Sequence, residues 1–176
     1  LRRRQRQMCI RDRYNPHCIV ALLRGGVVPA RILSDFLGID KMYTLGVAFY
    51  TDVAKHARRP TITQPLNVDM SGNDVLIVDD VADTGSSLIL ARETIMGLGA
   101  RSVRVATLHK KPWSEYTPDF YVDETDAWIV YPWEYYEVLE SLSHRVQKST
   151  NSSERRILNE TIERIRELLD KYWGIS

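Results

Sequence analysis

The sequence predicts an α/β fold in which helices flank a mostly parallel β-sheet. Apolar segments only a few residues long alternate along the chain with segments whose apolar residues recur at helical spacing. The segments at 18–23 and 75–78 are continuously apolar, which is typical of parallel strands buried on both faces. A succession of strand, helix and strand implies a parallel sheet, because the helix returns the chain to the end where the next strand begins.

The first predicted strand is the continuously apolar segment 18–23. Glycines interrupt it, and a helix from about 28 to 37 follows. Pro29 is tolerated in the first turn of this helix, and Gly38 can end it as a C-cap. Apolar and polar residues alternate from 41 to 50, so this segment is predicted as the next strand.

Residues 51–73 are interpreted as a long excursion from the sheet, in the form of a β-ribbon with a basic tip. Within it only 61–63 is predicted as a strand. Loops of this length in a compact domain are usually functional, and we interpret this one as a mobile hood over a binding site. Its basic residues are Lys55, His56, Arg58 and Arg59.

The rest of the chain repeats the alternation and then turns helical. The strand at 75–78 leads through an acidic loop into a helix that ends near 96. Further strands are predicted at 102–108, 119–122 and 127–130, and helices at 136–147 and 154–172. The apolar stripe of the last helix must be buried, on its own domain or on a partner subunit, since an isolated helix of this length is marginal in water.

Three segments are predicted from changes in composition. Residues 1–13 hold six arginines and one acid without apolar periodicity, so we interpret them as a non-native or linker segment, with a native basic arm as the alternative. Residues 14–136 form the predicted α/β domain, and 137–176 a C-terminal helical extension.

Composition narrows the class of protein. Apolar residues make up 44% and charged residues 27%, which is typical of a folded globular chain. No apolar run approaches the roughly 20 residues of a membrane span, and no secretory signal is recognisable, so we expect a cytoplasmic protein without a membrane partner. Two cysteines cannot form a disulfide scaffold. Without a helix-turn-helix signature, no nucleic-acid partner is expected.

The most informative segment is the acidic loop that follows the strand at 75–78. Asp79 and Asp80 stand where open α/β sheets bind their ligands, and their carboxylates suit sugar hydroxyls or hydrated Mg²⁺. Residues 84–87 then offer hydroxyls and N–H groups at a helix N-terminus, which favours a phosphate. A sugar phosphate would bridge both ends of the loop.

Two other interpretations of this loop stay open at this point. The hydroxyl residues could simply cap the helix. The paired acids could instead hold Mg²⁺ in a phosphotransferase, although the glycine-rich phosphate motifs of such enzymes are missing from the chain.

Residues 75–87, VLIVDDVADTGSS, resemble the 5-phosphoribosyl-1-pyrophosphate (PRPP) motif of the type I phosphoribosyltransferases. The resemblance implies that family's fold and assigns the ribose hydroxyls to Asp79 and Asp80. It assigns the 5′-phosphate to the residues that follow, namely Ala82, Asp83, Thr84, Gly85, Ser86 and Ser87.

Two further matches lie outside that motif. Arg24, Gly25 and Gly26 resemble the family's pyrophosphate loop, in which glycine lets backbone N–H groups approach the diphosphate. The segments KKPW at 110–113 and DAWIVYPWE at 126–134 resemble the purine pocket of archaeal-type xanthine-guanine phosphoribosyltransferases.

The resemblance implies a 6-oxopurine as the acceptor base. Asp83 would exchange a proton at purine N7 as the catalytic residue, and Lys111 would donate to O6. Trp128 would stack on the purine and Ile129 would offer main-chain groups. Lys110 is expected at the surface, and Trp113 and Trp133 are assigned to packing.

The implied reaction transfers the 5-phosphoribosyl group of PRPP to N9 of a purine base and releases pyrophosphate. Mg²⁺ would be bound through PRPP, with Asp79 and Asp80 as further candidate ligands. Members of the family are usually homodimers or homotetramers, so either is expected. Two alternatives remain: a phosphoribosyltransferase for another base, and a PRPP-sensing transcriptional regulator.

Overall fold

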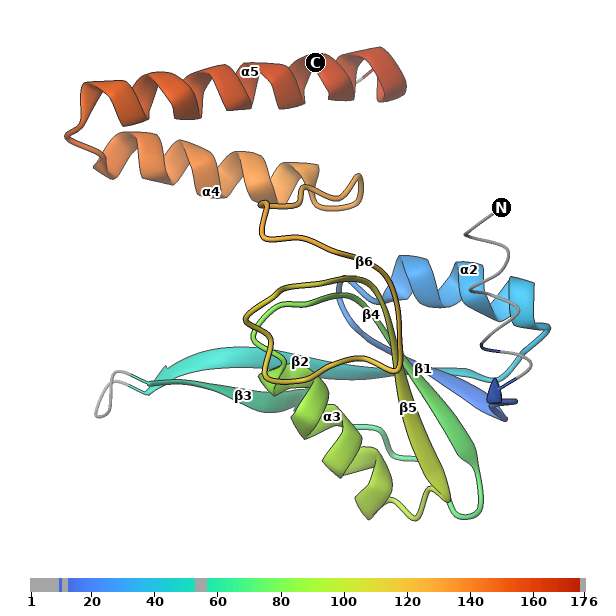
Figure 1. Cartoon of the computed structure of the whole chain (residues 1–176). Helices are drawn as coiled ribbons and strands as arrows, with labels where there is room; N and C mark the ends of the chain where they lie inside the picture. The colour runs from blue at the N-terminus through green and yellow to red at the C-terminus, as the bar shows by residue number, and fades with distance from the viewer. Residues whose placement is uncertain (1–9, 11–12, 53–56, 175–176) are drawn as a thin grey trace. The chain divides into compact units, whose positions relative to one another are not determined.

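The computed structural model describes residues 10, 13–52 and 57–174, which divide into two compact units, Leu1–Asp126 and Ala127–Ser176. The described part of the first unit is built on a six-stranded sheet in the order β3-β2-β1-β4-β5-β6 (Figure 1). Its strands are β1 Cys18–Leu23, β2 Met42–Asp52, β3 Ala57–Gln64, β4 Asp74–Ala82, β5 Ser102–Lys110 and β6 Phe120–Glu124. Neighbouring strands are parallel except β2 and β3, so the predicted α/β fold is confirmed.

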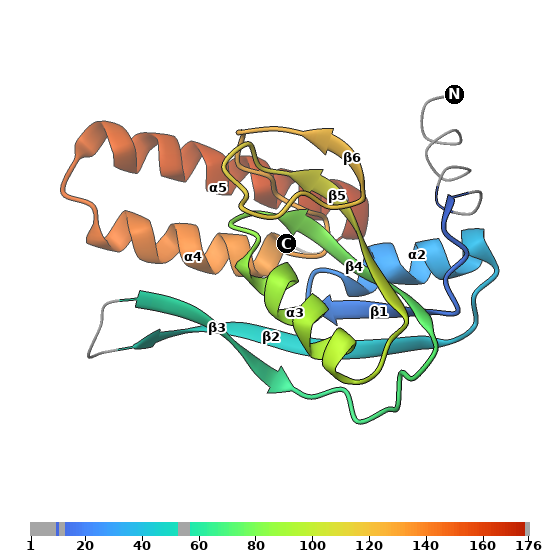
Figure 2. The same ribbon diagram turned by 60° about the horizontal axis from the view of Figure 1, so that its bottom comes forward.

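Two helices cover the sheet, α2 Val27–Leu37 on one face and α3 Ser86–Gly97 on the other (Figure 2). Side chains alternate between the faces along β1, so that Val20 packs with α3 and Ile19 packs with α2. Both are fully buried, as are their neighbours on β4. This double burial explains why β1 and residues 75–78 of β4 are apolar at every position.

The predicted excursion is in part a β-ribbon. β2 and β3 pair antiparallel from Gly46 with Gln64 to Asp52 with Ala57, and the ribbon projects from the sheet (Figure 1). Its second strand is longer than the predicted 61–63 because it pairs along the whole end of β2. Lys55 and His56 lie outside the described residues, whereas Arg59 lies on β3 and is exposed.

One predicted strand is wrong. Residues 127–130 form no strand, and β6 occupies the edge of the sheet with 120–124 instead. A segment of four residues becomes a strand only where a neighbouring strand supplies hydrogen-bond partners. The edge strand β6 ends at Glu124, so the residues after it have no such partner in the sheet. Residues 127–130 belong to the second unit.

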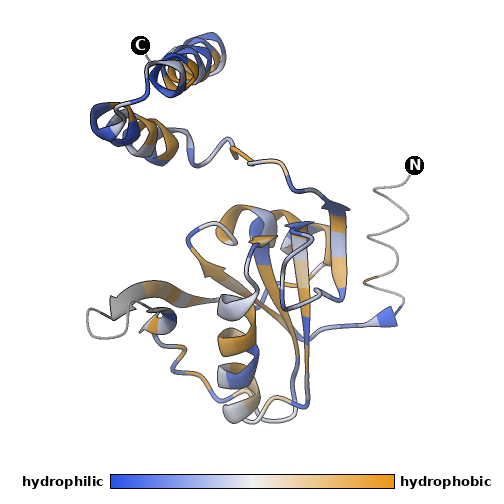
Figure 3. Cartoon of the chain, turned by 60° about the vertical axis from the view of Figure 1, so that its left-hand side comes forward, coloured by the Kyte–Doolittle hydropathy of each residue, from blue (hydrophilic) through white to orange (hydrophobic). Residues whose placement is uncertain are grey.

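The second unit holds two helices, α4 Tyr135–Lys148 and α5 Ser152–Trp173. Figure 3 colours an apolar stripe on each of them. The stripe of α5 is buried with that of α4, and consists of Leu158, Ile162, Ile165 and Leu169. Ile157, which the sequence places in the same stripe, is 59% exposed because it falls outside this i, i+4, i+7 spacing. The Asn151 side chain caps α5 by accepting from the N–H groups of Ser153 and Glu154.

Ile10, from the segment 1–13 that composition alone sets apart, contributes to the core of the first unit. Its side chain is 5% exposed and packs in the same core cluster as α2. An apolar side chain in an arginine-rich stretch has no sequence period to identify it as a core residue, which is why composition alone does not indicate this contact. The origin of the segment stays a prediction.

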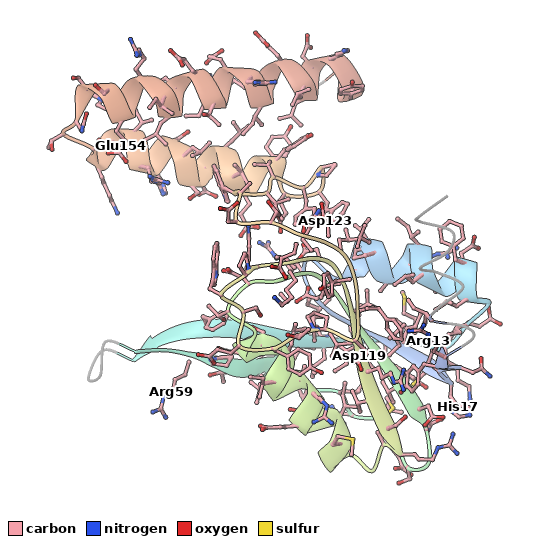
Figure 4. The ribbon with its side chains drawn as sticks, in the orientation of Figure 1. Arg13, His17, Arg59, Asp119, Asp123 and Glu154 are labelled. Carbon is pink, nitrogen blue, oxygen red and sulfur yellow. The ribbon has the colours of Figure 1, made fainter. Side chains whose placement is uncertain are left out.

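A polar cluster joins the amino-terminal ends of β4 and β5. The carboxylate of Asp74 accepts hydrogen bonds from the Arg101 guanidinium and, at 2.7 Å, from the Ser102 hydroxyl. Tyr14 donates its hydroxyl to the Val75 carbonyl at 2.9 Å. His17, labelled in Figure 4 near the start of β1, accepts from the Asp74 N–H at 2.9 Å. Among the described residues, no helix is both apolar enough and long enough to span a membrane.

Candidate active site

The acid pair lies within β4, because this strand continues to Ala82 rather than ending at Val78. Asp79 stands opposite Thr107 of β5 in the strand register. Its Oδ1 accepts from the Asp80 N–H at 3.0 Å. Both carboxylates therefore stand at the carboxyl end of a central strand, where the sequence places a ligand.

The pyrophosphate-loop candidate reaches this acid pair. Asp80 is 5% exposed, and a Cβ built at Gly25 would overlap its carboxylate. A Cβ at Gly26 would likewise overlap backbone atoms of Leu22 and Val78. Only glycine lets the loop between β1 and α2 pass so close to β4. Arg24 precedes these glycines and is exposed, after a cis peptide bond from Leu23.

The phosphate-loop candidate is the turn from β4 into α3. Asp83 and Thr84 are exposed, and Gly85 has φ of +88°, in the left-handed region that favours glycine. Gly85 is the N-cap of α3, so no side chain at that position caps the helix. The Thr84 hydroxyl accepts from the Ser86 N–H at 3.4 Å, a long bond that gives the capping interpretation little support.

A pocket of about 370 Å³ lies along this turn. It is lined by residues 79–88 and by Phe49 of β2, whose side chain is 45% exposed. The size is in the range of small-molecule sites. Phe49 was predicted only as one residue of an alternating strand, and nothing in that pattern indicates that it borders the pocket.

Lys110, at the end of β5, and Lys111, just after it, are both buried, and only Lys110 differs from the prediction. Lys110, expected at the surface, is 8% exposed, and its Nζ lies 3.0 Å from the Glu124 carboxylate of β6. The prediction failed because the partner carboxylate lies on another strand, fourteen residues away. Lys111 is 7% exposed, and its N–H donates to the Ala82 carbonyl at 2.9 Å, which brings it to the end of β4.

Trp113 was assigned to packing, and this is also wrong. Its side chain is 55% exposed, and the indole Nε1 donates to Asp83 Oδ1 at 2.9 Å. The Lys111 Nζ lies 5.5 Å from the centroid of its ring. The only feature of the sequence that could have indicated this contact is the position of Trp113, two residues after Lys111. Trp133, by contrast, is in a packing contact, with its ring stacked on Tyr131 at 5.0 Å.

His109 is a further residue near the carboxyl end of the sheet that sequence reasoning missed. It lies on β5 in register with Val81 of β4 and Asp123 of β6. Burial lowers the pKa of this imidazole, against a smaller rise from Asp123, so the neutral form is favoured at neutral pH.

The two remaining purine candidates, Trp128 and Ile129, belong to the second unit. Trp128 is 60% exposed and Ile129 is half-buried. Their roles toward a purine stay predictions.

The carboxylates of Asp79 and Asp80 are hard oxygen donors of the kind Mg²⁺ prefers. Asp80, however, is packed beneath Gly25 and nearly closed to solvent. Within residues 10, 13–52 and 57–174, no group of three or more acidic, histidine or cysteine side chains could hold a metal by itself. These carboxylates therefore fit a Mg²⁺ ion only where other ligands complete its coordination.

The chain is similar to known proteins over most of its length. The family model of the phosphoribosyl transferase domain matches residues 3–138. The xanthine-guanine phosphoribosyltransferase of Gluconobacter oxydans (strain 621H) is 32% identical over 118 residues, which are 66% of this chain and 67% of that protein.

Two solved structures share the fold. The purine phosphoribosyltransferase of Pyrococcus horikoshii is 36% identical, with a TM-score of 0.67 over 75% of this chain and 89% of that one. The xanthine-guanine-hypoxanthine phosphoribosyltransferase of Helicobacter pylori is 21% identical, with a TM-score of 0.64 over 80% of this chain and 91% of that one. That last likeness concerns the fold alone. With a family model over most of its length and two relatives above 30% identity, this chain belongs to the type I phosphoribosyltransferase family.

Proposed function

We propose that this protein transfers the 5-phosphoribosyl group of PRPP to N9 of a 6-oxopurine, in purine salvage. The products are the purine nucleoside 5′-monophosphate and pyrophosphate. The observation that carries the proposal is the close approach of Gly25 to Asp80, which joins the pyrophosphate-loop candidate to the acid pair at one end of the sheet. The names of the relatives, which are purine and xanthine-guanine enzymes, support the choice of base.

PRPP extends along the turn in this proposal. Its 5′-phosphate receives the N–H and hydroxyl groups of residues 84–87 at the start of α3, where the helix dipole favours an anion. The ribose hydroxyls donate to Asp79 and Asp80. The pyrophosphate lies against Arg24, Gly25 and Gly26, whose donors stabilise the charge that grows as it leaves. Mg²⁺ bound through PRPP, with Asp79 and Asp80 as further candidate ligands, would neutralise part of that charge.

The base is held by Asp83 and Lys111. The Asp83 carboxylate, which is exposed at the pocket, accepts the proton at N7 as the new bond to N9 forms. The Lys111 ammonium only donates, so it favours a 6-oxo group over the 6-amino group of adenine. Trp128 stacks on the ring and Ile129 offers main-chain groups. The β2–β3 ribbon closes over the site and excludes water that would hydrolyse PRPP.

A steady-state assay with PRPP, Mg²⁺ and each of five bases tests the proposal. We expect turnover with guanine, xanthine or hypoxanthine. The value of kcat/KM for adenine and uracil should be lower by at least about 10²-fold, because a hydrogen-bond donor of the site would be left without an acceptor when these bases bind. Turnover with adenine or uracil instead would favour an enzyme for another base. Tight PRPP binding without turnover on any base would favour a PRPP-sensing regulator.

We also propose a cytoplasmic homodimer or homotetramer. Light scattering of the purified chain, with and without PRPP, measures the oligomeric state. A monomer at micromolar concentration under both conditions would contradict this part of the proposal.

A further inference from the structure

The segment 111–116, which follows β5, is docked along the turn that carries Asp83. The Lys111 N–H donates to the Ala82 carbonyl and the Glu115 N–H to the Thr84 carbonyl, each at 2.9 Å. These two bonds lie on either side of Asp83 in the sequence. They hold the backbone of the turn and leave the exposed Asp83 side chain to be oriented by something else.

Close docking depends on Gly85. A Cβ at this position would lie 2.6 Å from the Tyr116 nitrogen and 2.9 Å from Ser114 Oγ. Ser114 in turn donates its hydroxyl to the Tyr116 carbonyl at 2.9 Å. The segment is therefore a defined loop with bonds of its own, and it keeps a fixed distance to the turn.

Trp113 is the side chain of this segment that reaches Asp83. Its Nε1–H donates to Asp83 Oδ1 at 2.9 Å, and an indole N–H can only donate. One carboxylate oxygen is thereby fixed, while the other stays available to a second partner. The same ring has the Lys111 Nζ at 5.5 Å from its centroid, within the range of a cation–π contact.

A tryptophan kept only for packing would bury its ring, yet this one is 55% exposed. Its contacts are with the two groups that are proposed to bind neighbouring positions on one edge of the purine, the carboxylate for N7 and the ammonium for O6. One planar ring thus sets the position of both groups relative to each other.

We propose that Trp113 is a positioning residue of the transfer reaction, which orients Asp83 through its indole N–H and Lys111 through its ring. The inference rests on the proposed function, because it gives Asp83 and Lys111 their roles toward the base. Trp113 itself exchanges no proton with the substrate.

The substitution Trp113→Phe separates the two contacts, since it removes the N–H donor and keeps a ring. We expect kcat with the preferred oxopurine to fall about tenfold, a part of the roughly 10²–10⁴-fold that a general acid–base group supplies. The KM values for PRPP and for the base should stay within about twofold. Trp113→Ala also removes the ring and should raise the KM for the base severalfold. Trp133→Phe, the same change at the indole stacked on Tyr131, is the matched control and should keep wild-type kinetics.

A double-mutant cycle distinguishes orientation of Asp83 from a general structural effect. When Asp83 is already replaced by alanine, the further substitution Trp113→Phe should not lower the activity again, because the carboxylate that Trp113 orients is no longer present. A readout independent of turnover is the indole N–H resonance that disappears in Trp113→Phe, which should shift in Asp83→Ala. Asp83 is exposed, so its replacement by alanine should leave the fold intact.

Wild-type kcat in Trp113→Phe, or an equal loss of activity with and without Asp83, would overturn the positioning role. An indole resonance unaffected by Asp83→Ala would overturn the hydrogen bond on which it rests. A wild-type chain that transfers phosphoribose to no 6-oxopurine, while its indole resonance still responds to Asp83→Ala, would overturn the proposed function and this role within it.

Discussion

At the scale of single residues, Gly25 is the position where the smallest change has the largest expected effect. A methyl group there would overlap the Asp80 carboxylate, so either that side chain or the loop must move. We expect Gly25→Ala to weaken PRPP binding by about tenfold or more, since shifts of roughly 1 Å in a site can cost up to about 10²-fold. Calorimetric titration with PRPP and Mg²⁺ measures this.

The control for that experiment is Gly97→Ala, at the last residue of α3, where an added Cβ meets no atom within 4 Å. It should bind PRPP as the wild type does. Equal affinities for all three proteins would mean that the approach of Gly25 to Asp80 has no part in PRPP binding.

Two isoleucines provide a matched test of the core. Ile10 is 5% exposed and packs with α2, whereas Ile157 is 59% exposed on α5. Ile10→Ala should lower the free energy of unfolding by about 2 kcal/mol or more, as for other buried isoleucines, and Ile157→Ala by well under about 1 kcal/mol. Urea denaturation followed by fluorescence compares them. A negligible effect of Ile10→Ala would return residues 1–13 to the role of a segment outside the fold.

At the scale of secondary-structure elements, the junction of β4 and β5 should make stability depend on pH. The Arg101 guanidinium, with the Ser102 hydroxyl, lowers the pKa of Asp74 to about 2 from an ordinary value of 3.8. A carboxyl group with a lowered pKa in the folded state stabilises the fold above its unfolded pKa. This stabilisation is lost as the pH falls from about 4 through about 2.

Asp74→Asn should therefore flatten the fall in melting temperature between pH 4 and pH 2. Thermal unfolding followed by circular dichroism at several pH values measures the slope. Asp126→Asn, at an exposed carboxylate, is the control and should keep the wild-type slope. A slope unchanged by Asp74→Asn would show that this carboxyl group contributes nothing to acid unfolding.

The elements also show how far the sequence could be interpreted. Periodicity correctly indicated β1 and all four described helices, because burial on one or two faces leaves a local pattern. It failed at 127–130, where only the presence of a neighbouring strand would have made a strand. It also failed for Lys110 and Trp113, whose partners Glu124 and Asp83 lie fourteen and thirty residues away. Such pairings depend on strand order, which a local pattern does not contain.

At the scale of the whole molecule, the two units have separate cores. The described clusters of the first unit are built from residues up to Phe120, and that of the second from residues after Ala127. We expect a fragment of residues 1–126 to fold and to bind PRPP with an affinity close to that of the full chain, since the pocket lining lies within it.

The same fragment should have a higher KM for the purine base, because it lacks Trp128 and Ile129, which are proposed to contact the base. Circular dichroism, calorimetry with PRPP and the five-base assay test these three expectations in turn. The full chain with Trp128→Ala is the control, in which only the stacking side chain is removed. A fragment with the wild-type KM for the base would exclude the second unit from purine binding.

The outer strand of the ribbon has one more consequence, for self-association. β3 is an edge strand, and edge strands with free N–H groups can recruit the edge of another copy into a shared sheet. Pro60 lies within it, opposite Phe49, and cannot donate a hydrogen bond, while the neighbouring Arg59 is exposed and carries a positive charge. If two copies paired along this edge, Pro60 could not donate a backbone hydrogen bond, and the Arg59 side chains of the two copies would repel each other. Pro60 and Arg59 therefore disfavour pairing of this edge with another copy of the chain.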